Sequence, residues 1–279
     1  MKSLRLCLLV ALLAAWPIAT TNAASPCKNR YADVRDVHMF YRVCGKGPPL
    51  VLLHGAAMVA EGWAPQIATF RKSYTVYIPE RRGVGRTADI DGDWTYRGMA
   101  DDMAAFMDKL KIKRAAVVGL SDGGNIALIL ASVRPDLVRA LVVSGANYDV
   151  AGLGAFKDDV EKMTPDELIA SAPPQVQPWI AIHRRVSPDK GAGLARAFAK
   201  MKRMWFDFEI SDGELNKIAA PTLITAGDDD MFSVPYTVSL WQKVPKAKLM
   251  IAPNATHFWL EEKPKLANHV IGDFLASAP

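Results

Sequence analysis

The sequence predicts an α/β protein whose mostly parallel sheet is covered by helices on both faces, with a helical cap inserted late in the sheet. Two observations lead to this prediction. In the first half of the chain, short apolar runs rich in β-branched residues alternate with stretches of helical spacing. Between Tyr148 and Ile218 the alternation stops, and only helical segments appear before strands resume. An excursion of this length predicts a cap, which we assign to residues 148–218.

The N-terminus differs from the rest of the chain. Lys2 and Arg5 precede an apolar run that ends at Trp16, and small residues follow where a signal peptidase would cleave. This pattern is typical of a cleavable secretory signal, and the run is too short to predict a retained membrane anchor. We expect residues 1–23 to be a signal peptide and residues 24–279 to be one exported domain, periplasmic or secreted, with no membrane association after cleavage.

Composition limits the class of partner. The chain has 279 residues, half of them hydrophobic, which is ample for one large α/β domain. Its formal net charge of +5 falls by two when Lys2 and Arg5 leave with the signal. No run of basic residues interleaved with aromatics is present. We therefore expect a small-molecule substrate and no nucleic-acid partner. The sequence does not predict an oligomeric state.

The first predicted element of the mature chain is a β-hairpin that brings two cysteines together. A two-residue turn at Arg35–Asp36 places Cys27 directly opposite Cys44. Cys7 leaves with the signal, so these are the two cysteines that remain. Because an exported protein meets an oxidising environment, we expect a disulfide between Cys27 and Cys44. The alternative is a pair of unbonded buried thiols.

The later elements follow from apolar runs and their periods. Each further strand is a short apolar run, and each helix shows apolar residues three or four positions apart. Strands are expected at 49–54, 74–79, 115–120, 139–145, 220–227 and 247–253. Helices are expected at 63–72, at 95–110, directly after Ser121, around 163–172, and at 193–208, 234–244 and 261–275.

Ser121 lies at the point where a predicted strand turns sharply into a predicted helix. Backbone at such a turn is strained, and the residues two before and two after must be small because their Cβ atoms would collide. Gly119 and Gly123 meet this requirement. The turn therefore presents a serine hydroxyl at the carboxyl end of a buried strand.

The Gly-x-Ser-x-Gly turn in this context resembles the nucleophile elbow of the α/β-hydrolase fold family. The His54–Gly55 turn, the loop Arg82–Thr87, the Gly-x-x-Asp sequence that begins at Gly227, and a late His257 add to the resemblance. Together they extend it over residues 50–279. The resemblance implies acyl chemistry at a serine, with no metal or organic cofactor, and no ligand cluster appears in the sequence.

The resemblance also implies a catalytic triad in the chain order Ser, Asp, His. A serine is a poor nucleophile until a neutral imidazole accepts its proton and a carboxylate orients that imidazole. We predict Ser121 as the nucleophile, His257 as the base and Asp230 as the acid. Asp149, after the preceding strand, remains an alternative acid. The other histidines are His38, His54, His183 and His269, and none of them follows a late strand.

The family forms its oxyanion hole from two backbone N–H groups, which here belong to Ala56 and Asp122. The resemblance makes His54 a structural residue of the turn. Two interpretations of the Asp122 side chain remain open. Acidic residues are favoured at a helix N-terminus by the helix dipole, or the carboxylate could select a cationic or amine-bearing substrate.

These predictions define an exported serine esterase for small to medium carboxylic esters. The same triad could cleave amides, lactones or carbon–carbon bonds, or form peracids. A ligand-binding protein with an idle triad is the non-enzyme alternative. Aromatic and methionine side chains of the cap either pack it onto the domain or line an apolar pocket. They are Trp179, Met201, Met204, Trp205, Phe206 and Phe208.

Overall fold

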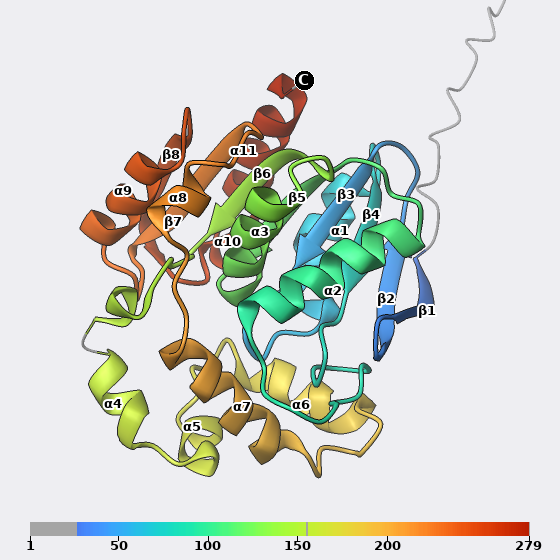
Figure 1. Cartoon of the computed structure of the whole chain (residues 1–279), viewed down its shortest axis with the longest axis vertical. Coiled ribbons are helices and arrows are strands. Elements are labelled where there is room, and N and C mark those ends of the chain that lie inside the picture. Colours follow the sequence, from blue (N-terminus) through green and yellow to red (C-terminus); the bar gives the residue numbers. More distant parts are fainter. Residues whose placement is uncertain (1–26, 155, 279) are drawn as a thin grey trace, which may run out of the picture.

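The computed structural model describes residues 27–154 and 156–278, which form an eight-stranded sheet with helices on both faces (Figure 1). The strand order is β1-β2-β4-β3-β5-β6-β7-β8. β2 pairs with its two neighbours in antiparallel fashion, and all the other pairs are parallel. The predicted fold class is therefore confirmed. The strands are β1 Lys28–Val34, β2 Val37–Cys44, β3 Pro49–Leu53, β4 Thr75–Pro79, β5 Ala115–Leu120, β6 Val138–Ser144, β7 Thr222–Asp229 and β8 Lys248–Thr256.

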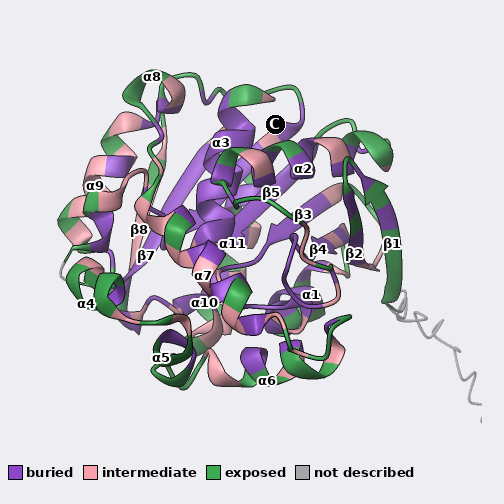
Figure 2. Cartoon of the chain, turned by 60° about the horizontal axis from the view of Figure 1, so that its bottom comes forward, coloured by how far each residue is buried: buried purple, intermediate pink, exposed green. Residues whose placement is uncertain are grey.

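The N-terminal hairpin forms one edge of the sheet. Lys28 pairs with Val43 and Val34 pairs with Val37, which is the register expected from a turn at Arg35–Asp36. The Sγ atoms of Cys27 and Cys44 lie 2.06 Å apart, so the structure joins these two residues by a disulfide. Most residues of β1 are exposed, as its green colour shows in Figure 2. The predicted signal peptide, residues 1–23, lies outside the described residues.

Helices cover both faces of the sheet. α2 (Tyr96–Lys109) and α3 (Asp122–Val133) lie in front of it in Figure 1, and α1 (Ala64–Phe70) and α11 (Pro264–Ser277) lie behind it. α9 (Val234–Lys243) packs on β7 and β8. Every residue of β5 is buried, because this central strand has neighbours on both sides and helices over both faces. The strand that leads into Ser121 is therefore packed on every side.

Among its described residues, the segment between β6 and β7 contains helices and one isolated bridge, between Asp149 and Glu209. Four of its helices gather at one end of the sheet as a cap (Figure 1). The cap helices are α4 Phe156–Lys162, α5 Pro165–Ala170, α6 Gln177–Val186 and α7 Leu194–Phe206, preceded by the short helix η2 Val150–Leu153. α8 (Asp212–Leu215) instead packs on α3. It thus belongs with the sheet, although the predicted cap range includes it.

Several element boundaries differ from the sequence prediction. α4 and α6 were not predicted from the sequence, because α4 buries only Val160 and α6 begins within a proline-rich stretch. β8 continues beyond Pro253 to Thr256 by pairing with Asp229 across a register shift. The predicted C-terminal helix is divided into α10 (Trp259–Glu262) and α11 at Pro264, which lacks a backbone N–H.

Nothing in the described part of the chain resembles a membrane span, since none of its helices is both long and apolar enough to cross a bilayer.

Candidate active site

Ser121 occupies the turn between β5 and α3. Its backbone angles are φ 55° and ψ −123°, in a region that residues with side chains rarely adopt, so the packing around it must hold the strain. A Cβ added at Gly119 would lie 2.3 Å from the carbonyl oxygen of Gly123. One added at Gly123 would lie 2.1 Å from the carbonyl oxygen of Leu53. Both positions therefore require glycine, as the sequence predicts.

His257 and Asp230 come together at the carboxyl ends of β8 and β7. His257 Nδ1 lies 2.8 Å from Asp230 Oδ1, which also accepts a hydrogen bond of 3.0 Å from the backbone N–H of Phe232. The Asp230 side chain is fully buried and that of His257 nearly so. A Cβ at Gly145 would lie 2.7 Å from the imidazole. The absence of a side chain at Gly145 thus gives the imidazole room beside Asp230.

Asp228, which lies near Asp230 in the sequence, and Asp149, the alternative acid, have partners other than His257. Asp228 accepts hydrogen bonds from the backbone N–H groups of Asn254 and Ala255, which lower the pKa of its carboxyl. Asp149, the alternative acid, accepts hydrogen bonds from the Tyr236 hydroxyl and from a backbone N–H at the start of η2. Geometry therefore pairs His257 with Asp230 and leaves Asp149 in a structural contact.

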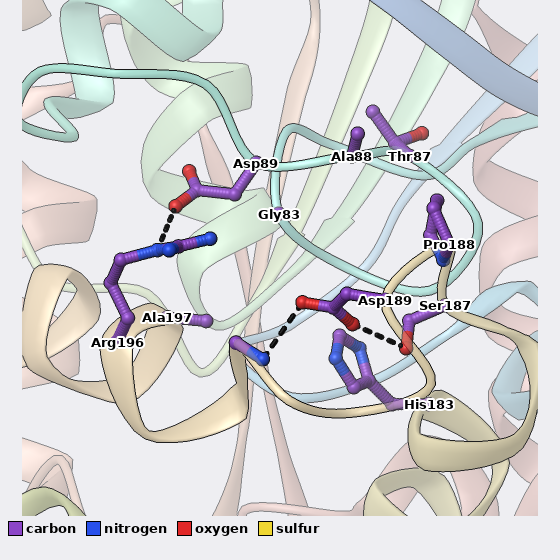
Figure 3. A pocket seen from close by; sticks show the side chains of 11 residues that line it. Gly83, Thr87, Ala88, Asp89, His183, Ser187, Pro188, Asp189, Arg196 and Ala197 are labelled. Atoms are coloured by element: carbon purple, nitrogen blue, oxygen red, sulfur yellow. Dashed lines mark hydrogen bonds and ion pairs between the residues drawn. The ribbon is translucent and has the colours of Figure 1, made fainter.

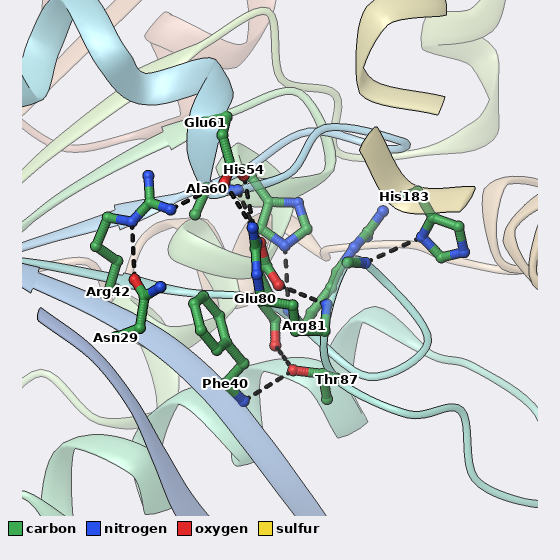
Figure 4. Close-up of polar contacts among 12 residues, drawn as sticks. Asn29, Phe40, Arg42, His54, Ala60, Glu61, Glu80, Arg81, Thr87 and His183 are labelled. Carbon is green, nitrogen blue, oxygen red and sulfur yellow. Dashed lines mark hydrogen bonds and ion pairs between the residues drawn. The ribbon is translucent and has the colours of Figure 1, made fainter. Parts of the chain in front are cut away.

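The other histidines are engaged in structural contacts. His54 Nδ1 lies 2.8 Å from the Gly55 carbonyl oxygen, and the backbone N–H of Arg81 donates to its Nε2 at 3.1 Å (Figure 4). Burial and the charge of Arg81 lower the pKa of His54 to about 3, so it stays neutral. His183 accepts from the Gly85 N–H, while His38 and His269 pair with aspartates on the surface.

The loop after β4 is organised by Glu80, which is completely buried. Its carboxylate accepts a hydrogen bond from the backbone N–H of Ala60 (Figure 4). It also accepts from the backbone N–H of Arg86 and, at 2.7 Å, from the Arg86 guanidinium. Burial raises the pKa of Glu80, but these donors stabilise its ionised form. Glu80 thereby ties this loop to Ala60, while the Arg81 backbone holds the loop against His54 in the turn beside Ser121.

The Asp122 side chain is held by partners that lie far from it in the sequence. Its Oδ1 accepts hydrogen bonds from the Tyr96 hydroxyl at 2.6 Å and from the Trp205 indole at 3.0 Å. Its Oδ2 lies 2.8 Å from Arg81 Nη2, and both side chains are about 95% buried. The carboxylate is neutralised within the protein, so the alternative in which Asp122 selects a cationic substrate is not supported.

The backbone at Ala56 and at Asp122 lies close to Ser121. A Cβ at Gly55 would approach Ser121 Cβ to 3.3 Å, which places the turn that contains Ala56 directly against the serine. Asp122 is the first residue of α3, so the helix provides no carbonyl partner for its backbone N–H. Two backbone segments that could supply oxyanion donors therefore converge on the Ser121 side chain.

Comparison with known proteins identifies the family that this arrangement belongs to. Residues 50–268 match the family described as "Alpha/beta hydrolase family". The chain belongs to the alpha/beta hydrolase family. The matched segment extends from β3 into α11 and so includes Ser121, Asp230 and His257. The family match is independent of the site geometry.

Relatives of this alpha/beta hydrolase include enzymes for several scissile groups. A protein named "Putative carbamate hydrolase RutD" from Azorhizobium caulinodans is 27% identical over 257 residues, 88% of this chain and 97% of that protein. The (E)-2-((N-methylformamido)methylene)succinate hydrolase of Acinetobacter baylyi is 26% identical over 265 residues, 88% of this chain and 96% of the relative. The crystal structure of an enol-lactonase from Burkholderia xenovorans LB400 superimposes with a TM-score of 0.75 at 22% identity, covering 89% and 100% of the two chains, and supports the fold.

The hydrolase has a cavity of about 600 Å³ between the sheet and the cap. Ser121, His257, Asp230, Ala56 and Asp122 all line it. Two of the cap aromatics singled out in the sequence, Trp179 and Trp205, also line it, whereas Met201, Met204, Phe206 and Phe208 do not. The remaining walls are mainly apolar, with Leu120, Leu153, Phe156, Met163, Leu168, Val176, Phe198, Met231, Phe232 and Phe258. The residues predicted for the site thus share one apolar cavity.

A second cavity of the hydrolase, about 120 Å³, lies between the loop after β4 and the cap (Figure 3). Its charged side chains bond to one another or to nearby groups: Asp89 pairs with Arg196, and Asp189 accepts from Ser187 and from the Gly193 N–H. None of the predicted triad residues Ser121, Asp230 and His257 lines this second cavity. Within residues 27–154 and 156–278, no three His, Cys, Asp or Glu side chains group as metal ligands would.

Proposed function

We propose that this alpha/beta hydrolase is a serine hydrolase that cleaves small to medium carboxylic esters through an acyl-enzyme. The single observation that carries the proposal is the 2.8 Å contact of His257 with buried Asp230 in a cavity that Ser121 also lines. A carboxylate on Nδ1 leaves Nε2 of the neutral imidazole free to accept a proton from a serine hydroxyl. This is the chemistry that a serine nucleophile requires.

In the proposed reaction, Ser121 Oγ attacks the ester carbonyl while its proton passes to His257 Nε2. The oxyanion that forms accepts hydrogen bonds from the N–H groups of Ala56 and Asp122. The tetrahedral intermediate collapses, the C–O bond to the alcohol breaks, and His257 protonates the leaving oxygen. Water, deprotonated by His257, then attacks the acyl-enzyme and releases the carboxylic acid, with the proton returned to Ser121 Oγ. Asp230 holds His257 and stabilises its charged form throughout.

The walls of the cavity favour neutral, apolar substrates. They include no lysine or arginine among the described residues, whereas Asp159 and Asp229 contribute negative charge. Arg81, behind the cavity, is already paired with Asp122. A substrate carboxylate would therefore lose its hydration without gaining a cation, which costs several kcal/mol. The volume of about 600 Å³ accommodates a medium acyl chain.

A matched pair of esters tests this preference. We expect kcat/KM for 4-nitrophenyl hexanoate to exceed that for mono-4-nitrophenyl adipate by about 100-fold, since the two acyl chains differ only by a terminal methyl or carboxylate. Spontaneous hydrolysis, measured without enzyme, is subtracted for each. Equal rates, or a preference for the adipate, would show that the cavity provides a cation and would overturn the proposed substrate class.

The names of the relatives favour a second candidate reaction at the same site. The relatives described above are named for carbamate, N-acyl-enamine-type and lactone substrates. A neutral carbamate ester and a neutral lactone therefore belong in the substrate panel. If the carbamate or the lactone is cleaved faster than every open-chain carboxylic ester, the triad mechanism stands and the assignment to open-chain esters is replaced. The ligand-binding alternative predicts no turnover of any substrate.

We also propose that the protein is exported and acquires a disulfide between Cys27 and Cys44. The basic and apolar N-terminal residues, and the pairing of the two cysteines across the N-terminal hairpin, support this proposal. Full-length protein expressed in a bacterium should be recovered outside the cytoplasm, with its N-terminus at Ala24 and with no thiol open to alkylation. A matched chain that starts at Ala24 should stay inside with two thiols. Recovery of uncleaved protein in the cytosol would contradict export.

A further inference from the structure

Arg81 makes several contacts near the predicted oxyanion hole, and the proposed mechanism assigns it no role. It lies in the loop after β4, and its side chain is 3% exposed. It does not line the large cavity. Nη2 donates a 2.6 Å hydrogen bond to the carbonyl oxygen of Ala56 and lies 2.8 Å from Asp122 Oδ2. One nitrogen thus contacts both residues to which we assign the oxyanion donors.

Arg81 also fixes the turn that precedes Ala56. Its backbone N–H donates to His54 Nε2 at 3.1 Å (Figure 4). His54 Nδ1 in turn contacts the carbonyl oxygen of Gly55 at 2.8 Å. Since His54 remains neutral, it can donate from Nδ1 and accept at Nε2 at the same time. The turn is therefore held at His54 by the Arg81 backbone and at Ala56 by the Arg81 guanidinium.

Asp122 provides the counter-charge for this arrangement. Tyr96 from α2 and Trp205 from the cap helix α7 both donate to Oδ1, which leaves Oδ2 to face the guanidinium. Arg81 and Asp122 form an ion pair, with Nη2 2.8 Å from Oδ2. Among the described residues, Oδ2 has no hydrogen-bond partner. The pair is buried, so its members depend strongly on each other. This dependence fixes the start of α3 relative to the Ala56 turn.

We propose that Arg81 is a positioning residue that sets the spacing of the oxyanion hole by bridging Ala56 and Asp122. The inference rests on the proposed function, because it assigns Arg81 a role through those two residues. The N–H groups of an oxyanion hole stabilise charge that develops in the transition state, not in the bound substrate. Loss of the bridge should therefore lower kcat and leave KM nearly unchanged.

The test compares Arg81→Leu with wild type on 4-nitrophenyl hexanoate. We expect kcat to fall about 10-fold to 100-fold, because small displacements of preorganised donors have effects of this size. KM should change by less than about threefold. A trifluoromethyl ketone, which forms a tetrahedral adduct on an active serine, should lose affinity by the same factor as kcat/KM.

The double variant Arg81→Leu/Asp122→Asn separates positioning from charge balance. It removes both charges together, and Asn keeps an acceptor for Tyr96 and Trp205, so it should fold even if the single variant does not. If Arg81 bridges the two segments, kcat of the double variant remains low, since the contact with Ala56 is still missing. Full recovery of kcat would show that Arg81 only neutralises Asp122 and would overturn the proposal.

Arg82→Leu is the matched control. Arg82 is the neighbouring arginine, largely buried, and it donates two hydrogen bonds to buried Asp102, 2.7 Å and 2.8 Å long, away from the cavity. This variant should lower Tm but keep the kcat of the folded enzyme. An active wild type with unchanged kcat in Arg81→Leu would overturn this inference and leave the proposed function intact. A wild type that neither turns over esters nor reacts with a serine probe would instead overturn the proposed function.

Discussion

Replacing Ser121 with alanine is expected to abolish covalent labelling by a fluorophosphonate and to lower kcat for ester hydrolysis by on the order of 10⁶. The loss is this large because the acyl-enzyme forms on the Ser121 oxygen, and no other group in the triad can replace it. Intact-mass measurement of the mature protein detects the adduct as a single added probe mass in wild type. The same measurement on Ser121→Ala should show none.

Ser132→Ala is a suitable control for this experiment. Ser132 is a buried serine on the same helix, α3, and its Oγ donates to the carbonyl oxygen of Ile129 within that helix. The substitution is chemically the same but lies outside the cavity, so labelling and kcat should match wild type. An adduct that persists in Ser121→Ala would assign the nucleophile to another residue. A wild type that never reacts would point to ligand binding in the capped cavity.

The features that could be predicted from sequence are those dictated by local geometry. Contacts within the turn and with Leu53 require glycine two residues before and two residues after Ser121. The local pattern from Gly119 to Gly123 is therefore enough to predict the turn. His257 and Asp230 each follow directly after a strand, and strand ends meet at one edge of a parallel sheet. Short-range pattern and sheet topology together therefore lead to the 2.8 Å contact.

The features that escaped prediction depend on contacts between distant segments. Asp122 was left with two interpretations because its partners Arg81, Tyr96 and Trp205 come from a loop, another helix and the cap. Two adjacent arginines, separated from the end of an apolar strand by Glu80 alone, are the one signal that could have indicated a buried ion pair. The cap helices were partly missed for a related reason. A helix such as α4, with one buried residue, has too little apolar periodicity to identify.

The Arg81–Asp122 ion pair and the apolar cavity together determine which charges the site must stabilise. Arg81, behind the wall, neutralises Asp122, which lines the cavity, and the carboxylate of Asp230 contacts His257. The charge that must be stabilised in the proposed mechanism therefore arises only during the reaction, on the oxyanion and on the imidazole. A substrate with its own charge would compete with this arrangement, whereas a neutral ester would not.

Asp230→Asn is the second large-effect prediction, and kcat should fall by about 10⁴ with little change in KM. The amide carries no charge to stabilise the imidazolium, and its NH₂ group can reverse the orientation of the imidazole. Asp149→Asn provides the matched control, because Asp149 bonds to Tyr236 and η2 instead of to the histidine. Its kcat should stay near that of wild type. If Asp149→Asn lost activity and Asp230→Asn kept it, the acid would be Asp149. His257 would then have to move from Asp230 to Asp149 in the active enzyme. The structure argues against that outcome, because Asp230 is fully buried against His257 while Asp149 caps η2.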